Sequence, residues 1–356
     1  MRSGVLLGSF PAATDAAGNG RDAERWEMMK VLVTGAGGFI GHHLVTFLKR
    51  QDCWVRGVDL KYPEFDATAA DEFAILDLRR WEHALEATRD VDEVYALAAD
   101  MGGMGSSRPI TDKILHNNAL INLHTLEAAR TNGVRRYLYT SSACVYPEYK
   151  QQETAVIPLK EEDTYPAQPQ DAYGWEKLIS ERFCLHYRED YGIETRIVRF
   201  HNIFGPPGTW EGGREKAPAA LCRKIAVAKL TGNPELEIWG DGEQTRSFCY
   251  IDDCVTGLYK LMRSDYCDPL NLGQDRPVTI DQVADMIAEI AGIRIRKKHV
   301  AGPQGVRGRN SDNTRLRRVL GWEPEISLEE GLACTYAWIE SQVQKKREHA
   351  EEAKTV

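Results

Sequence analysis

Residues 30–59 read KVLVTGAGGFIGHHLVTFLKRQDCWVRGVD, and this stretch decides the fold. An apolar run at 30–34 leads into a glycine-rich turn, and an amphipathic segment follows at 42–50. A second apolar run, at 54–58, ends on Asp59. This order predicts a buried strand, a tight turn, a helix and a second parallel strand. We therefore expect an α/β fold with a doubly wound parallel sheet.

The turn itself has the spacing of a dinucleotide site in a Rossmann-type sheet. Its first glycine permits the tight turn, its second lets a pyrophosphate approach the helix N-terminus, and its third lets the helix pack on the sheet. Glycines also occur in ordinary loops, but here they lie between a predicted strand and a predicted helix. We expect the turn to bind NAD through Gly35, Gly38, Phe39, Ile40 and Gly41.

Two acidic residues follow predicted strands. Asp59 is placed to accept hydrogen bonds from the adenosine ribose hydroxyls and to repel a 2′-phosphate, which favours NAD over NADP. Asp77 follows the strand expected at 73–76, where it would contact the adenine or cap the next helix. Further strands are expected at 93–97, 137–140 and 195–199.

A third feature is the order Ser142, Cys144, Tyr173, Lys177. A Tyr four residues before a Lys on a helix places both side chains on one face. The ammonium of Lys177 is then expected to lower the pKa of Tyr173 from about 10. Such a Tyr can take a proton from a sugar hydroxyl while hydride leaves the same carbon. Cys144 suggests that a second kind of chemistry follows this oxidation, although a small buried core residue is the alternative interpretation.

The bulk composition is that of an ordinary soluble protein. The 356 residues are 42% hydrophobic with a net charge of −8, so nonspecific nucleic-acid binding is not expected. No apolar run approaches the roughly 18 residues of a membrane helix. The eight Cys include no Cys-x-x-Cys pair, which argues against a metal site and gives no disulfide pattern. A reducing cytoplasm suits a free Cys144 thiol.

Four regions are expected along the chain. Residues 1–27 form a disordered extension or follow an upstream start codon, and 28–200 form mainly the NAD-binding domain. Residues 201–340 form mainly a smaller C-terminal α/β domain for the substrate, with some elements returning to the first sheet, and 341–356 form a charged tail. The helical patterns at 115–130 and 173–191 would form a dimer interface or cover the sheet.

Several segments carry a family resemblance: residues 99–105, 141–148, 169–174, 199–206, 212–220 and 305–313. Over about residues 29–340 the chain resembles the extended short-chain dehydrogenase/reductase superfamily. Within it, the glycine-methionine loop, the Cys of the serine motif, the Arg-Glu-Lys-Ala-Pro run and the Arg-Gly-Arg-Asn run resemble the GDP-mannose 3,5-epimerases. The resemblance implies one bound NAD per chain, a GDP-sugar substrate and a homodimer.

The resemblance also implies roles for the site residues. Tyr173 would act as base and acid at the C4 hydroxyl, Lys177 would hold the nicotinamide ribose, and Ser142 would bind the C4 oxygen. Cys144 would be the base at C3 and C5, and Lys216 the opposing acid or a phosphate contact. Arg246 and Arg309 would bind the diphosphate or form surface ion pairs. The other expected substrate contacts are Gly102, Ala143, Asn202, Glu215, Ala217, Lys224, Gln244 and Thr245.

Two other functions remain open. A nucleotide-sugar 4-epimerase or 4,6-dehydratase would share the scaffold, but a 4-epimerase does not need the pair Cys144 and Lys216. A 4,6-dehydratase would usually carry an Asp-Glu pair at positions 143 and 144. A noncatalytic NAD sensor would not need a tuned Tyr173. His201 is expected to have a packing or hydrogen-bonding role.

Overall fold

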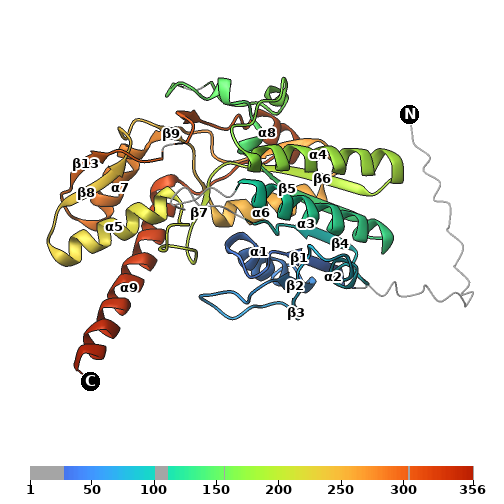
Figure 1. The fold of residues 1–356 in the computed structure, drawn as a ribbon, viewed down its shortest axis with the longest axis horizontal. Helices are drawn as coiled ribbons and strands as arrows, with labels where there is room; N and C mark the ends of the chain where they lie inside the picture. The colour runs from blue at the N-terminus through green and yellow to red at the C-terminus, as the bar shows by residue number, and fades with distance from the viewer. Residues whose placement is uncertain (1–27, 101–110, 156, 304, 356) are drawn as a thin grey trace, which may run out of the picture.

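The centre of the molecule is a parallel β-sheet. The computed structural model describes residues 28–100, 111–155, 157–303 and 305–355. In this part of the chain, seven strands pair in the order β11-β6-β5-β4-β1-β2-β3, each parallel to its neighbours (Figure 1). They are β1 (Lys30–Thr34), β2 (Trp54–Asp59), β3 (Glu72–Ile75), β4 (Glu93–Ala96), β5 (Arg136–Ser142), β6 (Glu194–Phe200) and β11 (Pro269–Leu272). The predicted doubly wound sheet is confirmed.

Helices cover both faces of this sheet, which is why its strands read as continuous apolar runs. In β1, Val31 and Val33 belong to the core beneath α1 (Phe39–Lys49) and α6 (Ile251–Arg263). Leu32, between them, belongs to the core on the opposite face. That face is covered by α2 (Trp81–Ala87), α3 (Thr111–Thr131) and α4 (Ala172–Tyr191).

A smaller region follows β6. It contains α5 (Ala217–Thr231), α7 (Ile280–Ala291), α8 (Thr314–Leu320) and α9 (Leu328–Thr355). Its short strands form small sheets: β8 (Glu235–Trp239) with β13 (Arg296–Val300), β7 (Ile203–Phe204) with β10 (Cys249–Tyr250), and β9 (Thr245–Arg246) between β12 (Val278–Thr279) and β14 (Gly308–Arg309). Because α6 and β11 return to the main sheet, that sheet contains residues from both sides of position 200.

The C-terminal segment is helical. The sequence analysis describes residues 341–356 as a charged tail, and α9 continues without a break to Thr355. Val343, a residue of this helix, is buried in the core, which extends the packed part beyond position 341. Further on, the chain consists largely of strong helix formers, and Arg347 pairs with Glu351 one turn away at 2.7 Å.

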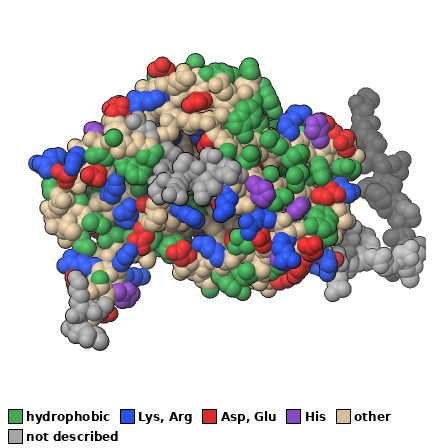
Figure 2. All heavy atoms as spheres, in the orientation of Figure 1, with side chains coloured by type: hydrophobic (Ala, Val, Ile, Leu, Met, Phe, Trp, Pro, Cys, Tyr) green, Lys and Arg blue, Asp and Glu red, His purple; other side chains and the backbone are tan. Residues whose placement is uncertain are grey.

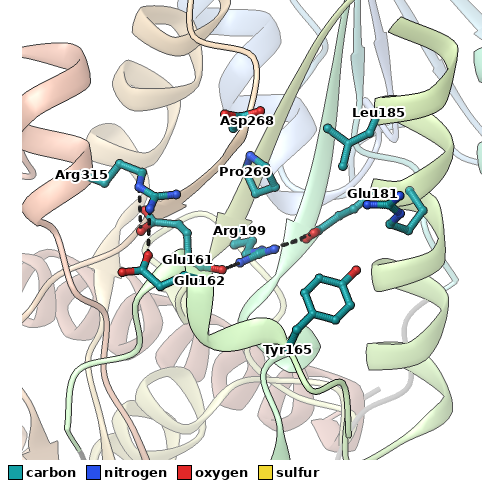
Figure 3. Close-up of a pocket in the computed structure, with 10 residues that line it drawn as sticks. Glu161, Glu162, Tyr165, Glu181, Leu185, Arg199, Asp268, Pro269 and Arg315 are labelled. Atoms are coloured by element: carbon teal, nitrogen blue, oxygen red, sulfur yellow. Dashed lines mark hydrogen bonds and ion pairs between the residues drawn. The ribbon is translucent and has the colours of Figure 1, made fainter. Parts of the chain in front are cut away.

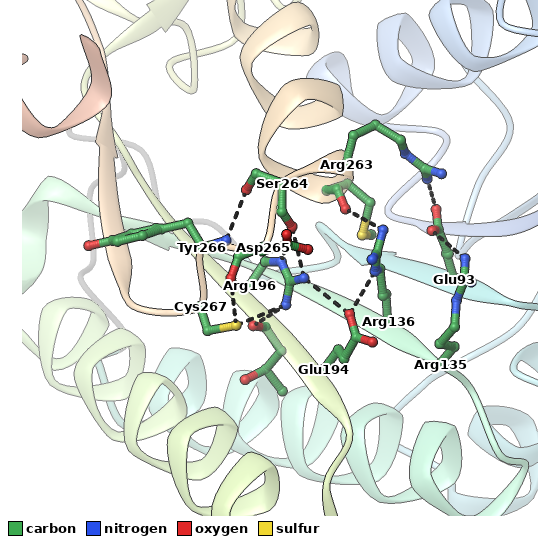
Figure 4. Close-up of polar contacts among 12 residues, drawn as sticks. Glu93, Arg135, Arg136, Glu194, Arg196, Arg263, Ser264, Asp265, Tyr266 and Cys267 are labelled. Atoms are coloured by element: carbon green, nitrogen blue, oxygen red, sulfur yellow. Dashed lines mark hydrogen bonds and ion pairs between the residues drawn. The ribbon is translucent and has the colours of Figure 1, made fainter. Parts of the chain in front are cut away.

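Ion pairs lie along the edge of the sheet at which the strands begin (Figure 4). Glu93, at the start of β4, is completely buried and contacts Arg263 and, at 3.5 Å, Arg135. Glu194, at the start of β6, bridges Arg136 at 2.8 Å and Arg196 at 3.1 Å. Each of the two carboxylates thus has two arginine partners at the amino-terminal edge. The candidate site lies at the opposite, carboxyl-terminal edge.

Candidate active site

The glycine turn follows β1 directly. Gly35 has a φ of +71°, and its N–H donates to the Val58 carbonyl at 2.8 Å. A Cβ at position 41 would come within 2.1 Å of the Gly35 carbonyl oxygen, so only glycine lets α1 start this close to β1. Gly38 is the N-cap residue of α1, and Phe39 and Ile40 form its first turn. The chain thus presents a helix N-terminus, which suits a pyrophosphate.

Asp59 supports the turn as well as ending β2. One carboxylate oxygen accepts the Gly37 N–H at 3.0 Å, and the other accepts the Leu60 N–H. A Cβ on Gly37 would lie 2.1 Å from the Lys61 carbonyl oxygen. Gly37 is therefore a constrained position that the sequence analysis missed, because the glycine spacing alone does not show the approach of the loop after β2.

A cavity adjoins this turn and is lined by residues 37–39, 61, 63–65 and 207–209, together with His42. Two contacts bring the second half of the chain against it. The His43 ring hydrogen-bonds the Pro207 carbonyl through Nε2 at 3.4 Å, and Phe65 packs edge-on against Trp338 of α9 at 5.0 Å between ring centroids. The glycines and helix N-terminus fit the phosphates of NAD, and the cavity lies beside them.

Asp77 has a partner within its own loop. Its carboxylate pairs with the Arg79 guanidinium at 2.6 Å, and this contact lowers the pKa of Asp77. The N-cap residue of α2 is Arg80, so the alternative in which Asp77 caps this helix is wrong. An adenine contact by Asp77 stays a prediction.

Ser142, Cys144 and Tyr173 come together at the carboxyl end of β5. Ser142 ends this strand, and its Oγ accepts the Cys144 N–H at 3.2 Å and also hydrogen-bonds the Tyr173 phenol. Ala143 and Cys144 lie in the 3₁₀ turn Ala143–Val145. A Cβ on Gly174 would come within 2.3 Å of the Cys144 carbonyl oxygen, so glycine lets α4 approach this turn.

Lys177 lies beneath Tyr173 on the same face of α4. Its Nζ donates to the Thr140 carbonyl at 3.0 Å and lies 5.5 Å from the centre of the Tyr173 ring. Burial raises the pKa of Tyr173 well above its ordinary value and lowers the pKa of Lys177. The expected lowering of the Tyr173 pKa is therefore wrong for this structure, because loss of solvent is the largest influence on it and the carboxylate of Glu176 acts in the same direction.

Arg309 and Arg246 lie beside Cys144. Arg309 Nη1 donates to the Cys144 sulfur at 3.3 Å, and Arg309 Nε donates to Gln151 Oε1 at 2.6 Å. Arg246 Nη2 donates to the Val306 carbonyl at 2.8 Å. Burial, and then the charge of Arg309, lower the pKa of Arg246 to about 10. Arg309 thus contacts the thiol and Arg246 lies close enough to interact with both, an arrangement that no local pattern indicates.

Lys216 and its neighbours start α5. Lys216 is the N-cap residue and is exposed, and its side chain makes no hydrogen bond or ion pair with any residue that the structure describes. Glu215 accepts the Gly213 N–H and pairs with Arg223 at 2.9 Å. Ala217 opens the helix, and Lys224 donates to the Glu237 carbonyl at 2.7 Å. The structure shows no contact between Lys216 and Cys144.

The remaining predicted substrate contacts occupy turns near β9. Asn202 has a φ of +46°, and its amide donates to the Ser247 carbonyl at 2.8 Å. Gln244 is buried, and its Oε1 has no hydrogen-bond partner among the residues described. Thr245 donates to the Thr154 carbonyl at 2.7 Å. Gly102 lies outside the described residues.

A buried polar network lies behind the serine motif (Figure 3). Glu181 of α4 accepts hydrogen bonds from Ser141 at 2.6 Å and from Arg199, which also donates to the Tyr146 hydroxyl at 3.2 Å. The pair Arg199 and Glu181 borders a cavity of about 250 Å³ that is also lined by Glu161, Glu162 and Arg315. None of the predicted site residues lines this cavity. The sequence analysis missed this network. The feature of the sequence that could have indicated it is a charged residue at the end of the apolar run 195–200.

His201 belongs to the same region, and the structure confirms a hydrogen-bonding role. It is fully buried, and its Nε2 hydrogen-bonds the Asn271 side-chain oxygen at 3.0 Å. Since the Asn271 amide nitrogen donates to the Leu159 carbonyl, the oxygen accepts and Nε2 carries the proton. Burial lowers the pKa of His201 to about 3.

The surface mixes charged side chains of both signs (Figure 2). Figure 2 shows Lys and Arg interspersed with Asp and Glu over the visible face. Among the described residues, no helix has the length and apolar character needed to cross a membrane. Within the same residues, no group of three or more His, Cys, Asp or Glu side chains is arranged to hold a metal ion.

The chain belongs to the NAD dependent epimerase/dehydratase family, whose model matches residues 31–273. It is an NAD-dependent epimerase. It is 49% identical to "GDP-mannose 3,5-epimerase" of Arabidopsis thaliana over 323 residues, covering 90% of this chain and 85% of that protein. It is also 49% identical to "GDP-mannose 3,5-epimerase 1" of Oryza sativa subsp. indica, covering 90% and 84%.

Solved structures agree with this assignment. UDP-glucose 4-epimerase from Thermotoga maritima superimposes with a TM-score of 0.80 at 26% identity, covering 88% of this chain and all of that one. UDP-glucuronic acid 4-epimerase from Bacillus cereus, in complex with UDP-glucuronic acid and NAD, gives a TM-score of 0.74 at 28% identity, covering 88% of this chain and all of that one.

Proposed function

We propose that this enzyme is a GDP-mannose 3,5-epimerase, which converts GDP-mannose to GDP-L-galactose, with GDP-L-gulose as the product of inversion at C5 alone. One observation carries the proposal: a cysteine with an arginine against its sulfur lies next to an intact Ser-Tyr-Lys set. The 49% identity to GDP-mannose 3,5-epimerases over 90% of the chain supports it. An enzyme that only inverts C4 does not need this cysteine.

The reaction requires oxidation before epimerisation. A hydrogen on an unactivated sugar carbon is too weak an acid for a side chain to remove. A ketone at C4 makes the hydrogens on C3 and C5 acidic, because the carbanion is delocalised into an enolate. NAD held at the glycine turn before α1 would supply the hydride acceptor for oxidation at C4 and the hydride donor for the return step.

Tyr173 and Ser142 handle the C4 oxygen. Tyr173 takes the proton of the C4 hydroxyl during oxidation and then holds it as a phenol, whose raised pKa suits the group that keeps this proton until it returns to the C4 oxygen on re-reduction. Lys177, 5.5 Å from the ring, favours the phenolate when Tyr173 acts as base. Ser142, already bonded to Tyr173, donates to the C4 oxygen and stabilises the enolate.

Cys144 and Lys216 act on the flanking carbons. Cys144 removes the proton from C3 or C5, and the guanidinium of Arg309 favours its thiolate. Lys216 supplies a proton from the opposite side of the ring. Its exposed position at the start of α5 leaves its ammonium available for the substrate.

The second part of the chain holds the nucleotide. Arg246 and Arg309 bind the diphosphate, because planar guanidinium groups match phosphate oxygens. The unpartnered Oε1 of buried Gln244 accepts a hydrogen bond from the substrate. The other proposed contacts are Gly102, Ala143, Asn202, Glu215, Ala217, Lys224 and Thr245. Residues 28–200 would form mainly the NAD-binding domain and residues 201–340 mainly the substrate domain.

We also propose a cytoplasmic homodimer. Helices α3 and α4 pack side by side, and their outer faces expose Leu115, Trp175, Ile179 and Tyr191. Large apolar side chains gathered on neighbouring helices favour association with a second copy.

Incubation with GDP-mannose in D₂O tests the function directly. The wild-type enzyme is expected to place deuterium at C3 and C5 and to form galacto- and gulo-configured products, detected by NMR and mass spectrometry. Cys144→Ala is expected to abolish both, whereas Cys334→Ala, at an exposed cysteine of α9, serves as the matched control and retains them. Absence of deuterium at both carbons in the wild type would contradict the proposal and favour inversion at C4 alone.

A further inference from the structure

Gln151 is held in one orientation by its surroundings. It is 1% exposed, and its side-chain nitrogen donates to the carbonyls of Tyr146 at 3.0 Å and Pro147 at 3.2 Å. Its backbone carbonyl accepts the N–H groups of Arg307 and Gly308. Because the amide nitrogen is committed to two carbonyls, the amide oxygen must face Arg309, whose Nε donates to it at 2.6 Å.

This contact determines where Arg309 points. The guanidinium is planar, so fixing Nε against Gln151 also fixes the direction of the terminal nitrogens. Nη1 then lies 3.3 Å from the Cys144 sulfur. Gln151 therefore acts on the sulfur through Arg309 and contacts neither the sulfur nor a reacting atom itself.

The side chain that orients Arg309 is neutral, unlike the carboxylates that pair with two other arginines. Buried Arg199 pairs with the carboxylate of Glu181, and Arg307 pairs with Asp241 at 2.8 Å. Arg309 instead has a neutral amide on one side and sulfur on the other, and no carboxylate among the described residues pairs with it. A carboxylate in that position would neutralise much of its charge, whereas an amide orients the guanidinium and leaves the charge directed at Cys144.

The other ionisable groups that interact with Cys144 are two cations and a phenol. Arg246 of β9 and Lys177 of α4 are cations that interact with it, and Tyr173 of α4 is a phenol kept neutral by burial. Arg309 of β14 is the cation that hydrogen-bonds the sulfur.

We propose that Gln151 is a positioning residue, which aims the guanidinium of Arg309 at the sulfur of Cys144. This inference rests on the proposed function for what the sulfur does in the reaction, whereas the orientation of Arg309 rests on these contacts.

The test is the pH profile of Cys144 alkylation by iodoacetamide in the NAD-bound protein, followed on the Cys144 peptide by mass spectrometry. Gln151→Glu keeps the size of the side chain and places a carboxylate against Arg309. We expect the pH of half-maximal alkylation to rise by about one unit. Alkylation of exposed Cys334 in the same sample is the internal control and should not change.

A second variant covers the case in which a buried glutamate prevents folding. Gln151→Met retains the bulk of the side chain but removes the oxygen that accepts the Arg309 hydrogen bond. Arg309 then keeps its charge but is no longer held in one orientation. We expect a smaller rise in the same pH midpoint, measured once retained NAD and the thermal unfolding midpoint show a folded protein. Profiles that coincide with the wild type in the folded variants would overturn the proposal. Since no sugar nucleotide is used, this result is independent of turnover of GDP-mannose, which tests the proposed function.

Discussion

Glu181→Gln should destabilise this enzyme more than any ordinary surface substitution. Glu181 and Arg199 are 3% and 2% exposed, and they share two hydrogen bonds, of 2.8 and 2.7 Å. Ser141 donates a third, of 2.6 Å, to the same carboxylate. Removing one partner of a buried ion pair costs about 3–5 kcal/mol, because it leaves the other charge without compensation.

The local contacts place the expected loss near the lower end of that range. Arg199 keeps its hydrogen bonds to the Tyr146 hydroxyl and the Glu161 carbonyl, and the amide oxygen of Gln can still accept from it. We therefore expect the free energy of unfolding to fall by about 3 kcal/mol. The measurement is urea unfolding at saturating NAD, with the midpoint and slope compared with those of the wild type.

A matched control and a double variant complete the experiment. Glu127→Gln breaks the partly exposed pair with Arg130 and should cost less than about 1 kcal/mol. Replacing both members of the buried pair, as Glu181→Leu with Arg199→Met, should recover much of the loss, because no unpaired charge remains. A loss below about 1 kcal/mol for Glu181→Gln, or full additivity in the double variant, would refute the reasoning.

Three further predictions concern catalysis, the cofactor and pH. Tyr173→Phe should retain NAD but lower turnover of GDP-mannose roughly 10²- to 10⁴-fold, and near-normal turnover would exclude the assigned role. Trp338→Ala removes the ring that packs on Phe65, so NAD should be released faster on dialysis, and unchanged retention would count against the contact. His201 has a folded pKa of about 3, below the roughly 6.5 of an unfolded chain, so the unfolded state binds more protons between these values. The wild-type free energy of unfolding should therefore fall on acidification from about pH 6.5 toward pH 3, by up to ~1.4 kcal/mol per pH unit from this group. In His201→Gln, the urea midpoint should fall less steeply as the pH is lowered. Equal slopes in the two proteins would show that His201 does not contribute.

Local patterns in the sequence predict the parts of the site whose members lie close together in the chain. The strand, glycine turn and helix at 30–50 follow from residue spacing, because Gly38 and Gly41 both lie against the Gly35 carbonyl within the same turn. Tyr173 and Lys177 share a helix face for the same reason. The continuous apolar strands predict a sheet covered on both sides, as observed.

The sequence by itself therefore determined the class of fold, the cofactor turn and the Ser-Tyr-Lys set, since these depend on short-range geometry. Only the tertiary structure decided what surrounds the thiol. Arg309 and Cys144 are 165 residues apart in the chain, and Arg309 and Gln151 are 158 apart. The pKa of Tyr173 was likewise decided by burial, which depends on packing of the whole domain rather than on the neighbouring lysine. Contacts of this kind leave no periodic signal, because they join loops whose meeting depends on how every intervening strand and helix is packed.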